Sequence, residues 1–226
     1  MMVNGSLTRV PACSLRAGRR AQGDGMVSRE SHANWSVYYD ATAGRPPRQT
    51  LLWALERAEA QPSQRRAVDL GCGDGRDTIE LLRRGWSVIA IDAEQIALDR
   101  LMTRPDLPAA AKLISRCGQF QDLVWPEADL VNASFCLPLC PPQRFSELWQ
   151  KITGSLARSG YFGGQLYGEH DDWARDPALS IFAETGARAL FADYAIERFE
   201  VEESDAVTPR GKRKHWHIFH FVARKA

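Results

Sequence analysis

The sequence predicts an α/β fold, in which helices cover a doubly wound sheet that is mostly parallel and has an antiparallel hairpin strand at the C-terminus. Short apolar strand-like segments alternate with helix-like segments from residue 66 to residue 166, as in parallel sheets. A glycine-rich turn joins the first of these strands to the next helix. Two long strand-like stretches then close the chain around a polar turn, which indicates a final hairpin.

The individual elements are expected in the following order. Residues 35–40 precede a turn at 43–48, and a helix then runs to about Ala58, because proline occupies its first turn and Leu51 and Leu55 share one face. The central elements are strand 66–70, helix 77–84, strand 86–92, helix 94–104, a strand near 113–115 and strand 129–134. The later elements are helix 142–157, strand 160–166, a helix within 177–189, and strands 194–203 and 214–224.

Composition places the chain among ordinary globular proteins. Its 226 residues suit one domain, and 25% of them are charged with a formal net charge of +1, so no strong field favours nucleic acid or an anionic membrane. No apolar run approaches the roughly 20 residues of a membrane span. The five cysteines form no disulfide or zinc framework, and reduced thiols in a cytoplasmic protein are expected.

Residues 1–30 differ from the rest of the chain. They carry Arg9, Arg16, Arg19 and Arg20 before the first acid, Asp24, and they show no hydrophobic periodicity. This composition is compatible with a transit peptide, but a disordered extension, or a stretch upstream of a true start at Met26, is the preferred interpretation. We therefore expect a disordered segment 1–30 and a functional domain that spans residues 31–226.

The glycine turn carries the functional prediction. Asp69 ends an apolar strand, and Gly71, Gly73 and Gly75 follow it in a G-x-G-x-G pattern. Dinucleotide-binding turns follow G-x-G-x-x-G instead, because their third glycine allows close packing around a pyrophosphate. Asp92 ends the next strand 23 residues after Asp69, a distance that suits hydrogen bonds to a ribose diol. The pattern favours a nucleoside cofactor that lacks a pyrophosphate.

Residues 69–75 resemble motif I of the class I S-adenosylmethionine-dependent methyltransferases, which have a Rossmann-like sheet. The run 38–40, the pair Arg76-Asp77 and the closing strand 215–224 narrow the resemblance to the bacterial tellurite-resistance-type (TehB-like) small-molecule methyltransferases. It covers roughly 190 residues, the size of one domain. The resemblance implies methyl transfer from S-adenosylmethionine to a small-molecule acceptor, with S-adenosylhomocysteine as the product.

The resemblance also implies where each part of the cofactor lies. Asp69 faces the methionine ammonium directly or through water, Asp92 accepts from the ribose hydroxyls, and Phe120 with Gln119 or Gln121 holds the adenine. The residues assigned to the cofactor are Tyr39, Arg45, Asp69, Gly71, Cys72, Gly73, Asp77, Asp92, Ala93, Gln119, Phe120 and Ala133.

Three further cofactor contacts come from the N-terminal part of the domain and from the end of strand 129–134. Arg45 or Arg48 is expected to bind the cofactor carboxylate through its guanidinium fork, and counting back from the helix favours Arg45. Tyr39 is expected to close over the cofactor. Ala133, followed by Ser134, is expected beneath the transferable methyl group, because ligands of open α/β sheets bind at the carboxyl ends of strands.

Two loops are expected to enclose the acceptor. Phe135 and Cys136 follow strand 129–134 and form one apolar wall, while Tyr167 and Trp173 form the other. His170 and Glu169 are the candidate general bases, with a charged surface loop as the alternative interpretation.

No metal site is predicted. Cys136 and Cys140 resemble half of a zinc site but have no second pair nearby. His215 and His217 share one face of the last strand, and the alternation of a half-buried strand explains their spacing without a ligand.

The predicted mechanism is in-line displacement, in which the protein aligns the nucleophile with the methyl group and excludes water. A soft nucleophile such as a thiol or selenol would need no strong base. The alternatives are a non-catalytic S-adenosylmethionine-binding regulator and an NAD-dependent oxidoreductase. Nucleic-acid methylation is disfavoured by the near-neutral charge and by the sequence Asn-Ala-Ser-Phe at 132–135 in place of an Asn-Pro-Pro-Tyr-like stretch. No nucleic-acid or membrane partner is expected, and the protein is expected to be a monomer or homodimer.

Overall fold

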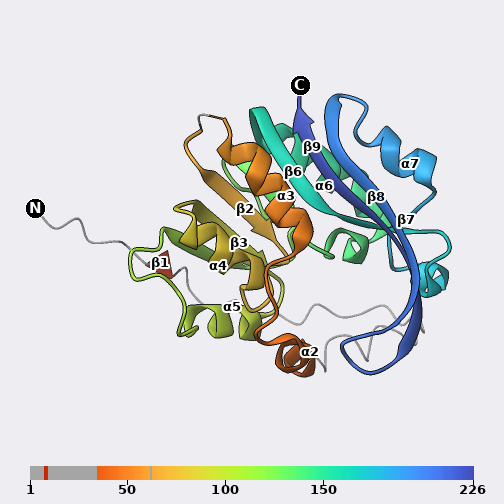
Figure 1. The fold of residues 1–226 in the computed structure, drawn as a ribbon, viewed down its shortest axis with the longest axis horizontal. Coiled ribbons are helices and arrows are strands. Elements are labelled where there is room, and N and C mark those ends of the chain that lie inside the picture. The colour runs from red at the N-terminus through yellow and green to blue at the C-terminus, as the bar shows by residue number, and fades with distance from the viewer. Residues whose placement is uncertain (1–7, 10–34, 62) are drawn as a thin grey trace, which may run out of the picture.

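The computed structural model describes residues 8–9, 35–61 and 63–226, which form one nine-stranded sheet with helices on both faces (Figure 1). The strands are β1 (Thr8–Arg9), β2 (Arg66–Leu70), β3 (Ser87–Asp92), β4 (Leu113–Cys117), β5 (Ala128–Ala133), β6 (Leu156–Gly168), β7 (Ile181–Phe182), β8 (Tyr194–Val207) and β9 (Arg213–Lys225). The helices are α2 (Trp35–Thr42), α3 (Gln49–Glu59), α4 (Arg76–Arg83), α5 (Gln95–Met102), α6 (Pro142–Ser155) and α7 (Glu184–Ala189), with short 3₁₀ turns at Leu137–Leu139 and Asp172–Arg175.

The strand order is β1-β4-β3-β2-β5-β6-β9-β8, with β7 paired to β6. Neighbouring strands are parallel from β1 to β6, whereas β9 is antiparallel to β6 and to β8. The predicted fold class is therefore confirmed. The chain moves outward from β2 to β3 and β4 and then returns to β5 on the other side of β2. This reversal between β2 and β5 opens a crevice at the carboxyl ends of the two strands, where α/β proteins bind ligands.

Two apolar clusters lie on opposite faces of the sheet. Alternation along β2 places Ala67 with α3, α4 and α5, and places Val68 and Leu70 with α6. Asp69 and Asn132 are register partners on β2 and β5 and fall on the same face as Ala67. The side-chain period of two thus turns a buried acid and a buried amide toward α4.

Several elements differ in extent from the prediction. Residues 35–42 form helix α2, where the sequence suggested only a stretch before a turn. The helix expected within 177–189 is shortened to α7, with β7 before it. β6 extends to 156–168, and β8 reaches Val207, because each strand continues as long as its neighbour offers backbone partners.

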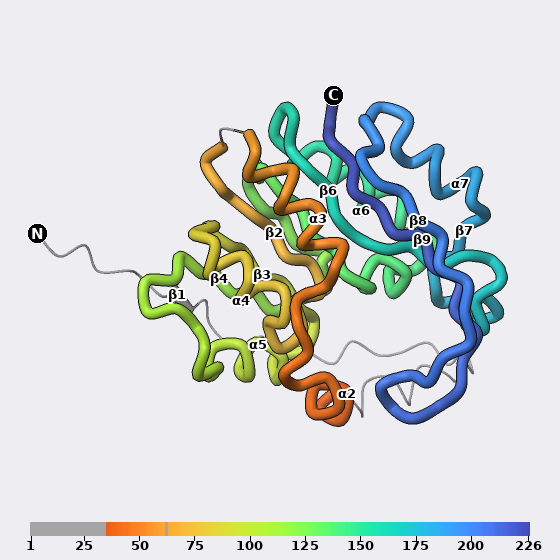
Figure 2. Tube along the Cα trace, viewed as in Figure 1, coloured from red at the N-terminus to blue at the C-terminus, as the bar shows by residue number. Residues whose placement is uncertain are grey.

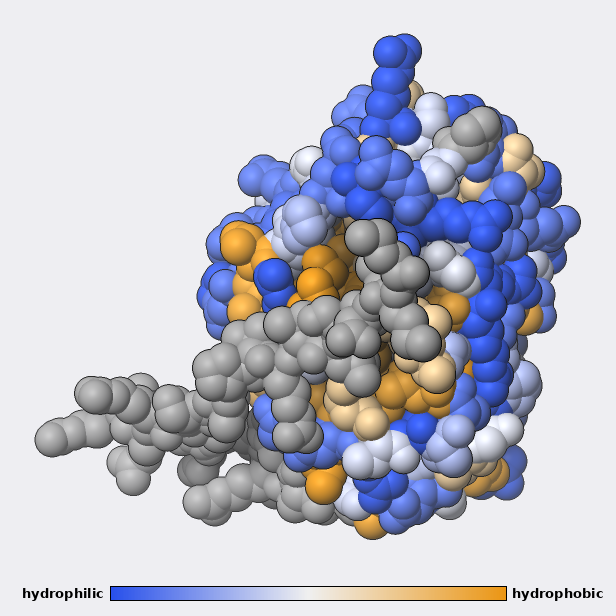
Figure 3. Space-filling model, turned by 90° about the vertical axis from the view of Figure 1, so that its left-hand side faces the viewer, coloured by the Kyte–Doolittle hydropathy of each residue, from blue (hydrophilic) through white to orange (hydrophobic). Residues whose placement is uncertain are grey.

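Most of the predicted N-terminal extension 1–30 lies outside the described residues. Thr8 and Arg9 pair in parallel with β4, and the division into segments 1–30 and 31–226 remains a prediction. No helix of the described part is long and apolar enough to cross a membrane. A view of the face at the left of Figure 1 shows apolar surface gathered near its middle with hydrophilic surface around it (Figure 3).

The β8–β9 hairpin curves away from the rest of the sheet (Figure 2). A buried ion pair connects this hairpin to the loop after β6. Lys214 Nζ of β9 lies 2.5 Å from Asp171 Oδ1, and their side chains are 3% and 0% exposed. The Tyr167, Trp173 and Trp216 rings surround the ammonium, with centroids 5.0, 4.1 and 3.4 Å from Nζ. We call these three rings the Lys214 cage.

We expect Lys214→Met to lower the free energy of unfolding by about 3–5 kcal/mol, because it leaves the Asp171 carboxylate buried without its cation. The double variant Lys214→Met/Asp171→Asn should recover most of this loss, since it removes both charges and keeps an acceptor for the Trp173 and His217 backbone N–H groups. Urea denaturation measures both values, and the exposed ion-pair variant Arg83→Met is the control. A double variant no more stable than Lys214→Met would contradict the assignment.

Candidate active site

The glycine turn after β2 approaches two other segments closely. Gly71 and Gly73 have φ values of 61° and 56°, which favour glycine. A Cβ at Gly71 would collide with Cys136, and one at Gly73 would lie 3.2 Å from Cε1 of Tyr39. Tyr39 of α2 therefore covers the turn, where the sequence expects it to close over the cofactor. Burial and the neighbouring Asp92 raise the pKa of the Tyr39 phenol.

Asp92 joins the end of β3 to this turn. Its Oδ2 accepts a 2.8 Å hydrogen bond from Gly73 N, and its Oδ1 accepts a 2.9 Å bond from Glu94 N. Burial raises the pKa of the carboxyl, although these two bonds act in the opposite direction. Each oxygen keeps a further lone pair for a hydrogen bond, and the ribose contact of Asp92 stays a prediction. Ala93, the next residue, is exposed.

Asp69 is enclosed by protein groups. Its carboxylate accepts hydrogen bonds from Thr78 Oγ1 at 2.5 Å and from Asn132 Nδ2 at 2.8 Å, and the residue is only 1% exposed. Burial and the nearby Asp77 raise the pKa of Asp69. The described contacts of this acid join β2, β5 and α4 to one another. The predicted contact with the cofactor ammonium remains a prediction.

Asp77 in the first turn of α4 connects the start of α3 to the end of β5. Its Oδ1 accepts a 2.8 Å hydrogen bond from Arg48 N, and its Oδ2 accepts bonds from Ser134 Oγ at 2.6 Å and Asn132 Nδ2 at 3.2 Å. A carboxylate is favourable at a helix N-terminus because of the helix dipole. Asp77 therefore positions Arg48 beside the residues that follow β5.

The arginine brought to the crevice is Arg48, whereas Arg45, which the sequence favoured, is exposed on the preceding turn. Arg48 Nη2 donates a 3.0 Å hydrogen bond to the Tyr38 hydroxyl, and its guanidinium carbon lies 4.3 Å from the Phe135 ring centroid. The hydrogen bond from the Arg48 amide to Asp77 brings Arg48, rather than Arg45, to the crevice. Spacing along the chain does not reveal this contact.

The adenine region contains an unsatisfied acceptor. Phe120 is 6% exposed and belongs to the apolar cluster beneath the sheet, and Gln119 is exposed. Gln121 is 8% exposed, and its buried Oε1 accepts no hydrogen bond from the described part of the chain. Such an atom is costly unless a donor reaches it. An adenine amino group is a suitable donor, so Gln121, one of the two residues that the sequence proposed, fits this role.

The residues after β5 divide between the crevice and the core. Phe135 has a φ of 58°, its N–H donates to Gln165 Oε1 at 3.0 Å, and its side chain lines a cleft described below. Cys136 instead turns under Gly71, where its Sγ donates to the Leu70 carbonyl at 3.0 Å. Burial raises the pKa of Cys136 and of Cys72 in the turn. The described side chain of Cys136 is therefore part of the core rather than a wall of the cleft.

The expected second wall is engaged elsewhere. Tyr167 and Trp173 belong to the Lys214 cage, and neither lines the cleft. Glu169 and His170 are exposed at the start of the loop that follows β6, and they do not line the cleft either. Ala133, at the carboxyl end of β5, is fully buried in the apolar cluster that packs against α6.

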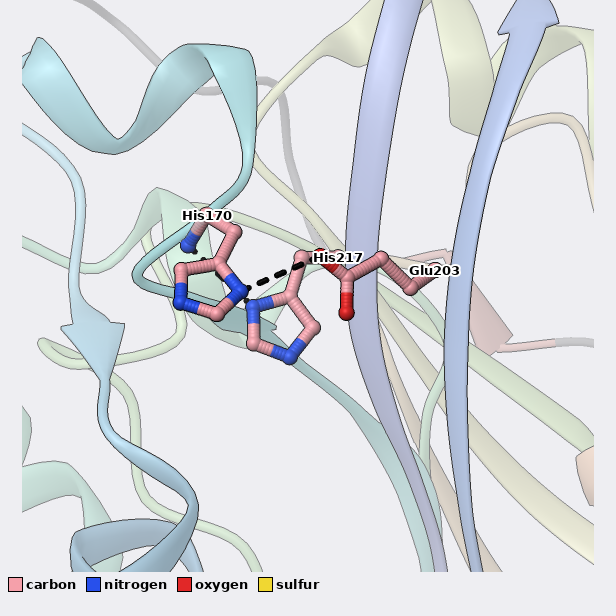
Figure 4. A group of neighbouring side chains, drawn as sticks. All are labelled: His170, Glu203 and His217. Atoms are coloured by element: carbon pink, nitrogen blue, oxygen red, sulfur yellow. Dashed lines mark hydrogen bonds and ion pairs between the residues drawn. The ribbon is translucent and has the colours of Figure 1, made fainter.

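Figure 4 shows how His170 lies against the hairpin. His170 Nδ1 donates to Glu203 Oε1 at 3.1 Å, and its ring stacks on that of His217 with centroids 4.6 Å apart. One candidate ligand atom from each of these three residues lies within 4.8 Å of the others. The His170 amide donates to His217 Nδ1 at 3.2 Å, so this lone pair already has a donor. These contacts attach the loop to the hairpin.

A cleft of about 620 Å³ lies beside Phe135. Its walls come from the start of α3, the first residue of α4, Phe135 in the segment after β5, strand β6 and the β8–β9 hairpin. The lining residues are Arg48, Gln49, Thr50, Trp53, Arg76, Phe135, Gln165, Glu200, Val201, Glu202, Glu203 and His220. Of these, the sequence prediction included only Phe135 as an acceptor residue and Arg48 as an alternative cofactor residue.

Comparisons with known proteins agree with this geometry. Residues 67–160 match the methyltransferase domain family. The chain is 32% identical over 133 residues to the biotin biosynthesis bifunctional protein BioHC of Cellvibrio japonicus, and this match covers 58% of the chain and 25% of the relative. A second curated relative is covered over 58% of its length, so the chain spans less than two thirds of either relative.

Solved structures share the fold. TehB from Haemophilus influenzae superposes with a TM-score of 0.64 at 15% identity, over 76% of this chain and 61% of that protein. The N-methyltransferase NodS from Bradyrhizobium japonicum, in complex with S-adenosylhomocysteine, gives a TM-score of 0.63 at 14% identity, over 84% of this chain and 97% of that protein.

The sheet order, the glycine turn and the family match over residues 67–160 resemble those of the class I S-adenosylmethionine-dependent methyltransferases. The predicted resemblance to TehB-like methyltransferases is confirmed, and S-adenosylmethionine is the cofactor of this class.

We expect Gln121→Leu to affect stability and binding in opposite directions. Removal of an unsatisfied buried carbonyl should leave the free energy of unfolding unchanged or raise it by up to about 1 kcal/mol. The loss of an acceptor for the adenine should weaken S-adenosylhomocysteine binding about tenfold, or about 1.4 kcal/mol. Urea denaturation and calorimetric titration measure the two effects. Gln150→Leu, at an exposed position of α6, is the control, and equal binding by both variants would contradict the assignment.

Proposed function

We propose that the protein transfers a methyl group from S-adenosylmethionine to a small-molecule acceptor held in the cleft beside Phe135. The observation that carries the proposal is the joint position of the glycine turn, Asp92 and this cleft at the carboxyl ends of β2, β3 and β5. A cofactor on the turn would present its reactive end toward the residues after β5, next to the cleft.

The described residues divide the binding task. Gly73 and Tyr39 would contact the cofactor through the turn, Asp92 would hold the ribose, and Gln121 the adenine. When bound, S-adenosylmethionine supplies an electrophilic methyl group that is already activated by its sulfonium. The protein then aligns the nucleophile and excludes water, which accounts for most of the acceleration in such displacements.

The acceptor is proposed to be small because the cleft is narrow enough to bury one compact molecule, within the usual range of ligand pockets. A thiol or selenol acceptor, suggested by the sequence, remains a proposal that an acceptor panel tests. For oxygen or nitrogen acceptors the sequence proposed His170 or Glu169 as the base, and both side chains lie outside the cleft.

The first test measures cofactor choice. We expect the wild-type protein to bind S-adenosylhomocysteine with micromolar affinity in calorimetric titration, and to bind NADH far more weakly. Asp92→Asn should weaken S-adenosylhomocysteine binding by about 10- to 100-fold, because loss of a charge-assisted hydrogen bond costs about 1.5–3 kcal/mol. The matched control is Asp193→Asn, an exposed acid far from the turn in sequence.

Three results would count against the proposal. A preference for NADH would support an oxidoreductase. Tight S-adenosylhomocysteine binding without methyl transfer to any acceptor would support a regulator that binds the cofactor. Equal binding by wild type and Asp92→Asn, with circular dichroism showing both folded, would remove the assigned ribose contact.

A further inference from the structure

The cleft beside Phe135 has walls of opposite charge. Arg48 and Arg76 line one side, and Glu200, Glu202 and Glu203 on β8 line the other. Glu200 is paired with Arg198, and Glu203 with His170 and His215, whereas Glu202 contacts His220 within the cleft. The glutamates come from a strand that the sequence analysis did not connect with the active site. This separation of charge within one small cleft is the starting point for inferring its ligand.

The arginine wall has capacity for an anion. Arg76 Nε donates to the Pro46 carbonyl at 2.5 Å, but its Nη1 is buried and has no hydrogen-bond partner among the described residues. Burial and the positive charge of Arg48 lower the pKa of the Arg76 guanidinium. A bound carboxylate would reduce the repulsion between the two guanidinium groups. It would also accept a hydrogen bond from the unpaired Nη1 of Arg76, because a carboxylate accepts several N–H bonds at once.

The opposite wall holds an imidazole next to a carboxylate. His220 of β9 donates from Nε2 to Glu202 Oε2 at 3.0 Å, and its side chain is only 15% exposed. Because a carboxylate accepts but does not donate, this bond places the proton of the neutral ring on Nε2 and leaves the lone pair on Nδ1. Glu202 also stabilises the imidazolium that forms when Nδ1 takes a proton, as carboxylates do for catalytic histidines.

The position of Nδ1 connects this pair to the place of methyl transfer. Nδ1 lies 3.5 Å from both Thr50 Oγ1 and Gln165 Nε2, which is at the limit of hydrogen bonding, so it is available to a closer donor. Gln165 is the register partner of His220 across β6 and β9, and its Oε1 holds the Phe135 amide at 3.0 Å. The Gln165 side chain thus lies between the His220 imidazole and the backbone of Phe135, which follows β5.

We infer that the acceptor is a small molecule with both a carboxylate and an amine, bound with its carboxylate on Arg48 and Arg76 and its nitrogen facing His220. This inference rests on the proposed methyl transfer and names its substrate class. His220 acts as the general base, and the glutamate wall attracts the protonated amine. Neither Glu169 nor His170 takes part in this step.

The proton and electron balance of the step is complete. The ammonium of the acceptor gives one proton to Nδ1 of His220 and becomes a neutral amine. The nitrogen lone pair then forms the new bond to the methyl carbon as the bond from that carbon to the sulfonium sulfur breaks, and the electron pair of the broken bond stays on sulfur. The products are a methylated ammonium, S-adenosylhomocysteine and an imidazolium that returns its proton to water.

The test uses matched sets of probe compounds with the full-length protein. One set is glycine, acetate and methylamine, and a second set is 4-aminobutyrate, butyrate and butylamine; 2-mercaptoethanol represents thiols. We expect transfer of labelled methyl to at least one compound with both groups, and at least tenfold slower transfer to compounds with one. Calorimetric titration into protein saturated with S-adenosylhomocysteine should show the same preference for binding.

Variants separate the two walls. Arg48→Gln should raise the acceptor KM at least tenfold with kcat within threefold, and Arg57→Gln, exposed on the same helix, is its control. His220→Gln should lower kcat at least a hundredfold with little change in KM. His215→Gln on the same strand, outside the cleft, is its control. Glu202→Gln keeps the imidazole and should lower kcat by a smaller factor.

The pH dependence gives a readout that a structural role would not move. In the wild type, kcat/KM should fall toward acidic pH as the base becomes protonated, and this limb should disappear in His220→Gln. The charged groups that share the cleft with His220 are Glu200, Glu202 and Glu203 of β8 and Arg48 and Arg76 at the starts of the facing helices. Arg198 of β8 adds a positive charge at the rim, where it pairs with Glu200 and packs on Trp53. The limb must therefore persist in Glu202→Gln, at a shifted pH, if His220 is the group that titrates.

Several outcomes overturn the inference while leaving the proposed function intact. One such outcome is that 2-mercaptoethanol, or a compound with only one of the two groups, is methylated as fast as the compounds with both groups. Another is that neither compound with both groups is methylated. If Arg48→Gln loses S-adenosylhomocysteine binding and keeps its acceptor KM, the arginine wall holds the cofactor carboxylate instead. Absence of S-adenosylhomocysteine binding by the wild type would overturn the proposed function itself.

Discussion

The carboxylate of Asp77 joins three segments of the chain at one point beside the crevice. It accepts the backbone N–H of Arg48 and the hydroxyl of Ser134, and it shares the Asn132 amide with Asp69. The start of α3, the first turn of α4 and the end of β5 are thereby held at one point. The cleft depends on this point, because its arginine wall and Phe135 come from the segments that Asp77 connects. Burial raises the pKa of Asp69, and the nearby Asp77 carboxylate raises it further.

The parts of the site that could be predicted are those set by local geometry. A strand, a glycine turn and a helix form one unit, so the positions of Gly71 and Gly73 follow from the sequence alone. Asp92 follows as well, because consecutive parallel strands bring their carboxyl ends together. Gln121 marks the limit of such reasoning: the loop between β4 and β5 has no period, and only the fold decides which of its residues is buried.

The acceptor side could not be predicted because it depends on the register of an antiparallel hairpin. His220 faces Gln165 only in the observed pairing, and a slip of one residue would turn it to the other face of the sheet. Cys136 and Tyr167 show a related limitation. Cys136 follows β5 as expected, whereas Tyr167 lies within β6 rather than in the loop after it, and the direction of neither side chain follows from the sequence. Close approach at the turn directs Cys136 inward, and the buried charge of Lys214 draws Tyr167 into its cage.

The buried thiols at the turn have a chemical consequence for any protein that handles an alkylating agent. A sulfonium methyl donor reacts readily with thiolates, and the proposed cofactor position lies close to Cys72 and Cys136. Both thiols have a raised pKa because they are buried, and Cys136 is also engaged by the Leu70 carbonyl. The thiolate is the reactive form, and it is suppressed at both positions. The same packing that shapes the turn thus protects the chain from methylating its own sulfur.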